Sequence, residues 1–216
     1  RMRRVWLEKN GNKRVILFFS GWGLDERAVS HMTGESDVLM LYDYRNIEGE
    51  KAPVLNGYES IDVIAWSMGV WAASVLLPLW NLPVDRSTAI NGTERPVDNL
   101  YGIPLHVYLL TERGMDERGR DKFFVRMLSG TGERTRFKQH HPDRNLEEQL
   151  EELKAIREQS DRLKGEICWN RVYISENDII FPVTNQENWW RGRSEIKKIV
   201  GGHYPFYVFE NWDLII

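Results

Sequence analysis

The sequence predicts an α/β fold, in which helices flank a mostly parallel β-sheet. The run at 15–19 is continuously apolar, as expected for a strand covered on both faces, and the runs at 38–42 and 61–66 have the same character. Helix-forming segments alternate with these runs, which is typical of a parallel sheet. The 216 residues are enough for one well-buried domain and few for two, so we expect 1–216 to be a single domain.

The first expected elements are two strands, at 5–8 and 13–19. The dipeptide Asn10-Gly11 between them accepts the positive φ of a tight turn, which predicts that the strands pair as a hairpin. A helix is expected to begin at Gly69 and to end near Pro78, because proline disrupts a helix interior. The other expected elements are strands at 38–42, 61–66, 87–90, 171–175 and 196–200 and a helix at 183–190.

The segment from about 104 to 165 breaks this alternation. It is highly charged, and its last part, 146–163, is predicted to be a polar helix with apolar residues at helical spacing. Propensity and periodicity leave 105–110 open between strand and helix. We expect the whole segment to be an insertion over one end of the sheet.

Composition and charge exclude several classes of protein. The 29 basic and 32 acidic residues nearly balance, at a net charge of −3, which argues against a nucleic-acid binder. Cys168 is the only cysteine, so the chain is not a disulfide-built secreted scaffold. No apolar segment follows the first residues, and the longest apolar stretch, at 69–80, is shorter than the roughly 20 residues that cross a membrane. We expect a cytoplasmic protein with no signal peptide and no membrane partner.

No sequence pattern points to a metal or a cofactor. The histidines and the cysteine lack the spacing of a zinc site. Gly21 and Gly23 are too few for a dinucleotide-binding loop. We therefore expect neither a metal nor a cofactor.

The strongest functional signal is Ala65-Trp66-Ser67-Met68-Gly69, between an apolar strand and an Ala- and Leu-rich helix. A nucleophile elbow is such a strand-to-helix turn, and it exposes its central serine at the top of the sheet. The residues two before and two after the serine must be small; Ala65 and Gly69 are small, although glycine is more usual in the first place. An ordinary glycine-capped junction is the alternative. We favour Ser67 as a catalytic nucleophile.

The motif Phe18-Phe19-Ser20-Gly21-Trp22-Gly23, directly after a buried strand, is a candidate oxyanion loop. A serine hydrolase needs backbone N–H groups aimed at the developing oxyanion, one from the residue after the nucleophile and one from an early loop. Trp22 and Met68 are the candidates for these donors. A plain glycine turn is the alternative.

His203 is the favoured general base. It stands in Gly201-Gly202-His203 after the last predicted strand, on a loop from which an imidazole can reach Ser67 at the carboxyl edge of the sheet. The other histidines are His31, His106, His140 and His141. Of these, the one in the apolar run at 105–110 is expected to be packed, and the adjacent pair in the charged insertion is expected at the surface.

Asp178 is the favoured acid of a triad. It follows a predicted strand and precedes His203 by 25 residues, so its carboxylate can accept the imidazole Nδ1–H. Glu176 is the alternative acid, and a carboxylate that merely caps the next helix is the alternative role. The order Ser, Asp, His is that of the α/β-hydrolases, so the sequence predicts an α/β-hydrolase fold and ester hydrolysis.

Further motifs extend this pattern along nearly the whole chain. They are Phe19-Ser20-Gly21-Trp22-Gly23, Asp43-Tyr44-Arg45, Ala65-Trp66-Ser67-Met68-Gly69-Val70, Asn91-Gly92-Thr93 with Pro96, Tyr101-Gly102-Ile103-Pro104 and His203-Tyr204-Pro205-Phe206. Together they resemble the BioG-type pimeloyl-[acyl-carrier protein] methyl ester esterases of bacterial biotin synthesis. The resemblance is weakest across about 112–165.

The resemblance implies roles for the residues that match the family's motifs. Ser67 would be the nucleophile, His203 the base, Asp178 the acid, and Trp22 and Met68 the oxyanion donors. The substrate would be a pimeloyl chain on an acyl-carrier protein, capped by a methyl ester that is hydrolysed to methanol. The insertion at about 104–165 would be a helical lid, which favours a helix at 105–110.

Part of this insertion is locally basic. Segment 111–140 holds eight basic and five acidic residues, a local charge of +3, and such a surface could steer an acidic carrier protein. A solvated helix face explains the same charges. Phe123 and Phe124 are candidates to line an acyl channel, and packing within the lid is their alternative role.

Two other functions remain open from the sequence. A thioesterase or broad-specificity esterase could use the same triad, because the sequence identifies the catalytic groups and not the leaving group. A non-catalytic binding module on a hydrolase scaffold is disfavoured, because Ser67, the donor loop and His203 are all present. The sequence leaves the oligomeric state undetermined, and we favour a monomer.

Overall fold

The computed structural model describes residues 1–216 and contains one seven-stranded sheet of order β1-β3-β2-β4-β5-β6-β7. β1 is antiparallel to β3, and all other neighbouring strands are parallel. The predicted α/β class is therefore confirmed. The strands are β1 (Arg3–Glu8), β2 (Arg14–Phe19), β3 (Asp37–Tyr42), β4 (Ser60–Trp66), β5 (Val84–Ile90), β6 (Arg171–Ser175) and β7 (Ile196–Ile199).

The predicted hairpin of the first two strands is wrong. β1 pairs with β3, and β2 lies on the far side of β3. The Asp37 carboxylate at the start of β3 explains the crossing: its Oδ1 accepts hydrogen bonds from the Asn10 backbone N–H at 2.9 Å and from the Asn12 side-chain amide at 2.8 Å. The Asn10-Gly11 segment thus passes across the start of β3, although Gly11 does adopt the positive φ that its sequence predicts.

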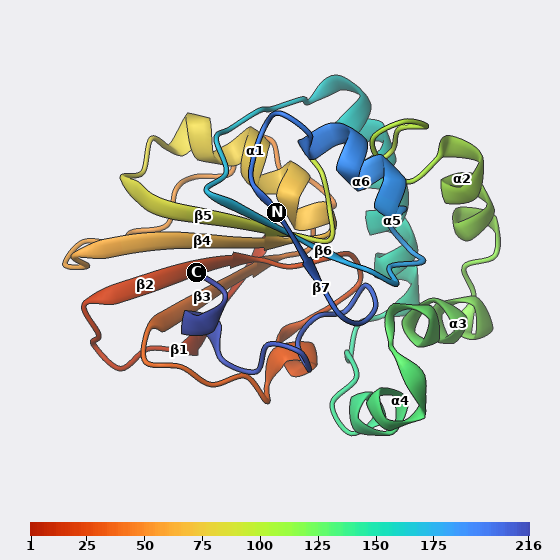
Figure 1. Ribbon diagram of the computed structural model, residues 1–216, viewed down its shortest axis with the longest axis horizontal. Helices are drawn as coiled ribbons and strands as arrows, with labels where there is room; N and C mark the ends of the chain where they lie inside the picture. The colour runs from red at the N-terminus through yellow and green to blue at the C-terminus, as the bar shows by residue number, and fades with distance from the viewer.

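The longer helices fall into two groups (Figure 1). α1 lies beside the sheet, and α2, α3 and α4 gather beyond one end of it, with α5 behind α6 in the same view. The helices are α1 (Met68–Trp80), α2 (Leu105–Arg113), α3 (Glu117–Met127), α4 (Gly130–Lys138), α5 (Leu146–Arg162) and α6 (Val183–Trp190), with short 3₁₀ helices at Glu26–Val29 and Trp212–Leu214. The segment left open at 105–110 is helical, and the expected insertion contributes α2–α5.

Helix α1 continues past Pro78, where we expected it to end. Pro78 has no N–H, so within the helix only the carbonyl of Ser74 loses its partner. The helix ends instead where Asn81 adopts the left-handed conformation, with φ +51° and its N–H donating to the Leu77 carbonyl at 3.1 Å.

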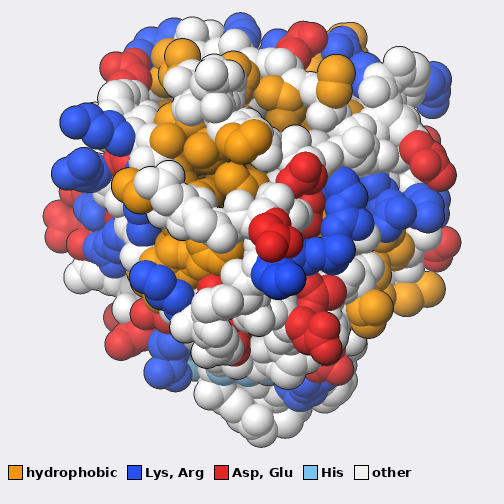
Figure 2. Space-filling model, turned by 90° about the vertical axis from the view of Figure 1, so that its left-hand side faces the viewer, with side chains coloured by type: hydrophobic (Ala, Val, Ile, Leu, Met, Phe, Trp, Pro, Cys, Tyr) orange, Lys and Arg blue, Asp and Glu red, His pale blue; other side chains and the backbone are white.

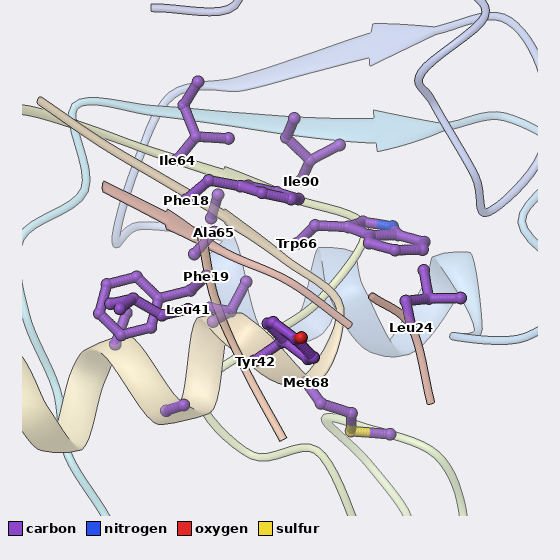
Figure 3. Close-up of a cluster of buried hydrophobic side chains, with 14 of the residues drawn as sticks. Phe18, Phe19, Leu24, Leu41, Tyr42, Ile64, Ala65, Trp66, Met68 and Ile90 are labelled. Carbon is purple, nitrogen blue, oxygen red and sulfur yellow. The ribbon is translucent and has the colours of Figure 1, made fainter. Parts of the chain in front are cut away.

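Neighbouring side chains of β2 cover opposite faces of the sheet. Phe19 stacks on Trp80 of α1, with ring centroids 6.0 Å apart. Phe18 contacts Phe206 and Trp212 of the C-terminal segment, at 5.5 and 4.7 Å between ring centroids. Figure 3 shows Phe18 and Phe19 in a buried cluster with side chains of β4. Because successive side chains of a strand alternate between faces, α1 covers one face of the sheet and the C-terminal segment covers the other.

The outer surface opposite α2–α4 carries no part of the insertion. Figure 2 shows that hydrophobic side chains gather near the middle of this face and that charged side chains surround them. No helix combines the length and the apolar character needed to cross a membrane.

Candidate active site

Ser67 stands on a sharp, strained turn between β4 and α1. Its backbone has φ +58° and ψ −124°, a conformation that non-glycine residues rarely adopt. A Cβ on Gly69 would lie 2.2 Å from the Phe19 carbonyl oxygen, and one on Gly92 would lie 2.3 Å from the Ser67 carbonyl oxygen. The end of β2 and the loop after β5 thus press directly on the elbow. The sequence predicts a small residue at Gly69 but not the close contact at Gly92, for which the motif Asn91-Gly92-Thr93 is the available signal.

The structure brings Ser67, His203 and Asp178 into one hydrogen-bonded chain. His203 Nε2 lies 2.9 Å from Ser67 Oγ, and His203 Nδ1 lies 2.8 Å from Asp178 Oδ2. All three side chains are buried. They follow β4, β7 and β6 respectively, so their backbones meet at the carboxyl edge of the parallel sheet. This is the geometry of a serine nucleophile, its base and the acid that orients the base.

The loop of His203 is held by the two central strands. The His203 carbonyl accepts hydrogen bonds from Trp66 Nε1 and from Asn91 Nδ2, each at 2.9 Å. The Tyr204 N–H donates to the carbonyl of Met127 at 3.0 Å, which links this loop to the end of α3. The imidazole is thus oriented from the elbow strand, from the loop after β5 and from the insertion.

Asp178, and not Glu176, faces the imidazole. Asp178 Oδ1 accepts from the N–H groups of Ile180 and Phe181 at 2.9 Å each, and Oδ2 accepts from Gln186 Nε2 at 3.1 Å besides facing His203. Glu176 is exposed. The carboxylate therefore has a fixed direction, set by the first turn beyond β6 and by a glutamine of α6 that the sequence argument did not single out.

Trp22 and Met68 flank Ser67. Gly21 packs against the elbow so closely that a Cβ there would lie 3.4 Å from Ser67 Cβ and 3.1 Å from the Trp66 ring. The backbone N–H of Trp22, the next residue, donates to no protein acceptor. Met68 is the first residue of α1, where a backbone N–H has no partner within the helix. Both N–H groups are therefore available to a ligand beside Ser67.

A small, mostly apolar pocket with about 20 Å³ of free space lies at Ser67. It contains no lysine, arginine or carboxylate. Burial raises the pKa of the Tyr108 phenol well above its usual value, so Tyr108 stays neutral in the pocket wall and donates to the Leu153 carbonyl at 2.5 Å. The lining residues are Gly21, Trp22, Trp66, Ser67, Met68, Ile103, Tyr108, Thr111, Phe123, Met127, Leu153 and His203.

Of the two candidate phenylalanines, only Phe123 lines this pocket. Its ring meets Trp22 edge to face at 4.9 Å between centroids. Phe124 is buried against Phe137 of α4, at 5.8 Å between centroids. The side chains differ because neighbouring positions on a helix point in different directions, and the predicted lining role of Phe124 is not supported.

The remaining histidines lie away from the hydrogen-bonded chain. The rings of His31 and His140 lie 4.8 Å apart between centroids at an interplanar angle of 43°, and burial lowers the pKa of each. His140 was expected at the surface, but it is half-buried and its Nε2 contacts the Tyr207 hydroxyl at 2.5 Å. His106, expected to be packed, is exposed. No group of three or more histidine, cysteine or acidic side chains is arranged to hold a metal ion.

The chain has the fold of the α/β-hydrolases. Its structure matches an α/β-hydrolase enzyme from a Medee basin deep-sea metagenome library with a TM-score of 0.63, at 12% identity over 96% of this chain and 89% of that one. The model of the family described as "Pimeloyl-ACP methyl esterase BioG" matches residues 2–215 of the chain. The chain therefore belongs to this family.

Two relatives are closer in sequence. The solved structure of BioG from Haemophilus influenzae superposes with a TM-score of 0.89, at 30% identity over 100% of this chain and 99% of that chain. A Bacteroides fragilis protein named "Malonyl-[acyl-carrier protein] O-methyltransferase" is 42% identical over 89% of this chain. The chain spans only 40% of the length of that relative.

The elbow geometry predicts that Gly92→Ala destabilises the protein. The added methyl group would overlap the Ser67 carbonyl oxygen, so we expect a loss of about 1–3 kcal/mol or more in the free energy of unfolding, measured with urea. Gly132→Ala is the control, because no heavy atom would lie within 4 Å of its Cβ and it stands in helix α4. The control should unfold at an equal or higher urea concentration. A Gly92→Ala protein as stable as the wild type would contradict the packing argument.

Proposed function

We propose that this protein hydrolyses the methyl ester of a pimeloyl chain carried on an acyl-carrier protein. The observation that carries the proposal is the buried hydrogen-bonded chain of Ser67, His203 and Asp178 at the bottom of an apolar pocket. Membership of the BioG family supports the esterase class and suggests this substrate.

The reaction follows from the positions of these groups. Ser67 Oγ attacks the ester carbonyl carbon while His203 Nε2 takes the hydroxyl proton, and Asp178 stabilises the imidazolium that forms. The Trp22 and Met68 N–H groups donate to the oxyanion of the tetrahedral intermediate. The intermediate collapses, His203 returns the proton to the leaving oxygen, and methanol departs. A water, deprotonated by His203, then cleaves the acyl-enzyme and releases the free carboxylate and Ser67.

The chemistry of the pocket supports a neutral ester as substrate. A methyl ester can enter an apolar pocket without cationic side chains, whereas the product carboxylate would lose its hydration there without a counter-ion. The Bacteroides fragilis relative bears the name of an enzyme that methylates a carrier-bound malonyl group, so a carrier-bound methyl ester is a fitting substrate for its homologous segment.

We further propose that α2–α5 act as a lid over this pocket. Ile103, which immediately precedes the insertion, and four residues within it, Tyr108, Phe123, Met127 and Leu153, supply much of the apolar wall. Residues 1–216 would form one domain with this lid, active in the cytoplasm as a monomer without metal or cofactor.

The surface of α3 is our candidate for docking the carrier protein. Arg118, Lys122 and Arg126 are exposed and line one surface depression together with Glu117 and Asp121. Arg120 is not part of this surface, because its guanidinium turns inward and donates to the Gln149 side-chain oxygen at 3.2 Å. The three exposed cations favour an acidic partner.

A direct assay tests the proposed reaction. Incubation with pimeloyl-carrier-protein methyl ester should lower the mass of the carrier-bound group by that of one CH2, because –OCH3 becomes –OH. A fluorophosphonate should label the protein once, on Ser67. Ser67→Ala should abolish both events, because Ser67 is the hydroxyl that His203 Nε2 contacts. Hydrolysis of the thioester to the carrier instead of the methyl ester would favour a thioesterase. Full labelling of Ser67→Ala would contradict the assignment of the nucleophile.

The acid of the triad has its own test. Asp178→Asn removes the acceptor of the His203 Nδ1–H, so kcat should fall by about 10⁴, as in serine proteases with the same substitution. Glu176→Gln, in the same loop, is the control and should keep wild-type kcat. A large loss of kcat in Glu176→Gln together with wild-type kcat in Asp178→Asn would identify Glu176, and not Asp178, as the acid of the triad.

Charge reversal tests the docking surface. Arg118, Lys122 and Arg126 changed together to Glu should lower kcat/KM several-fold on carrier-bound ester and leave p-nitrophenyl butyrate hydrolysis unchanged, because long-range steering affects association and not chemistry. Salt should reduce the wild-type advantage, since charges are screened over about 8–10 Å at physiological ionic strength. Lys9, Lys13 and Lys51, all exposed, make a matched control triple. Equal losses on both substrates would indicate damage to the lid.

A further inference from the structure

Helix α5 is linked to the loop after β2 by buried hydrogen bonds. Glu152 Oε1 accepts from the Gly23 N–H at 3.1 Å, and Gln149 Nε2 donates to the Gly23 carbonyl at 2.8 Å. Trp22 Nε1 donates to the Gln149 carbonyl at 2.7 Å. Both polar groups of Gly23 and the indole of Trp22 therefore have partners on one helix that lies more than 120 residues away in the sequence.

The Glu152 carboxylate is fixed by further donors. Its Oε1 also accepts from Arg144 Nη1 at 3.0 Å, and its Oε2 accepts from the Tyr44 N–H at 3.0 Å. Arg144 reaches the same loop, because its Nη1 also donates to the Leu24 carbonyl at 3.1 Å. The carboxylate thus stands at a junction of the loop after β2, the loop after β3 and helix α5.

A buried ion pair is a costly way to attach a helix. The side chains of Glu152 and Arg144 are fully buried, and burial raises the pKa of the Glu152 carboxyl while Arg144 offsets part of that rise. Apolar side chains of similar size would often hold two elements together as well or better. Directional hydrogen bonds add what apolar packing lacks, because they set the orientation of a peptide group.

The loop that is held in this way lies against the nucleophile. Gly21 packs on Ser67 and Trp66, and Trp22 carries the unpaired backbone N–H. Gly23 has φ +74°, and glycine adopts positive φ values about as readily as negative ones, so its own preference does not fix the loop. The peptide after Trp22 is fixed by Glu152, and the Trp22 side chain is fixed by the Gln149 carbonyl. Little freedom remains for the direction of the Trp22 N–H.

We propose that Gln149 and Glu152 are positioning residues, which align the Trp22 N–H with the oxyanion formed at Ser67. The inference rests on the proposed esterase function. It makes helix α5 part of the support of the catalytic groups, in addition to its role in the pocket wall.

Gln149→Met tests the inference, because it keeps the size of the side chain and removes the donor to Gly23; it also removes the acceptor of Arg120, a contact outside the loop after β2. An oxyanion donor acts in the transition state, and its complete loss costs about 10²–10³ in kcat. We expect misalignment to lower kcat about 10- to 100-fold with KM within about twofold of wild type. The inhibition constant of 1,1,1-trifluorooctan-2-one, whose serine hemiketal mimics the tetrahedral intermediate, should rise in parallel with the loss of kcat/KM.

Gln159→Met is the matched control. Gln159 is a buried glutamine of the same helix, and it is bonded to the loop after β3. Its side chain donates to the Tyr44 carbonyl at 2.7 Å and accepts from the Ile47 N–H at 2.9 Å. The Gln159→Met variant should lower the melting temperature about as much as Gln149→Met does. Its kcat and its inhibition by the ketone should equal those of the wild type. Glu152→Gln is a second test variant, since one amide oxygen cannot replace both carboxylate oxygens.

The outcomes separate the inference from the proposed function. If wild type lacks esterase activity or Ser67→Ala retains it, the proposed function fails and the inference fails with it. If both of those controls behave as expected, wild-type kcat and ketone inhibition in a folded Gln149→Met overturn the inference alone. Equal losses of kcat in Gln149→Met and Gln159→Met would overturn it too, because they would indicate a general effect of loosening α5.

Discussion

The backbone turn at Ser67 is the constraint on which the surrounding structure depends. A non-glycine residue keeps a φ of +58° only where its neighbours over-determine the conformation. Here the carbonyl of Phe19 presses on Gly69 from one side, and Gly92 presses on the Ser67 carbonyl from the other. The strands that supply these contacts, β2 and β5, are the direct neighbours of β4 in the sheet. The strand order therefore explains why the end of β2 and the loop after β5 both contact the turn after β4.

The same strands also hold the partners of the serine. Trp66, the last residue of β4, and Asn91, just after β5, both donate to the His203 carbonyl. The Asn91 side chain also donates to Ser175 Oγ at 2.8 Å, at the end of β6 from which the Asp178 loop departs. The loops of His203 and Asp178 are thus tied to β4 and β5 through side-chain hydrogen bonds of Trp66 and Asn91.

Local pattern predicted the elements well and their pairing less well. The bounds expected for β6 and α6 agree with the structure, because apolar runs and helical spacing are properties of neighbouring residues. The hairpin failed because the Asp37 contacts to Asn10 and Asn12 are not visible in a turn motif. Ser67, Asp178 and His203 could be selected from loop context and chain order. Gln149 and Glu152 could not, because polar residues of a charged helix resemble a solvated face until the distant Gly23 is placed beside them.

The packing of the C-terminal segment has a consequence for synthesis on the ribosome. Phe206 and Trp212 cover Phe18 on one face of the sheet, and the Trp212 N–H donates to the Thr33 carbonyl at 2.9 Å, near the opposite end of the chain. A nascent chain that has emerged only as far as α6 therefore contains the Ser67 elbow, but it lacks the imidazole and leaves the Phe18 face uncovered. The cover over Phe18 and the imidazole that contacts Ser67 both come from the residues after α6. An incomplete translation product consequently lacks both the base and a closed core.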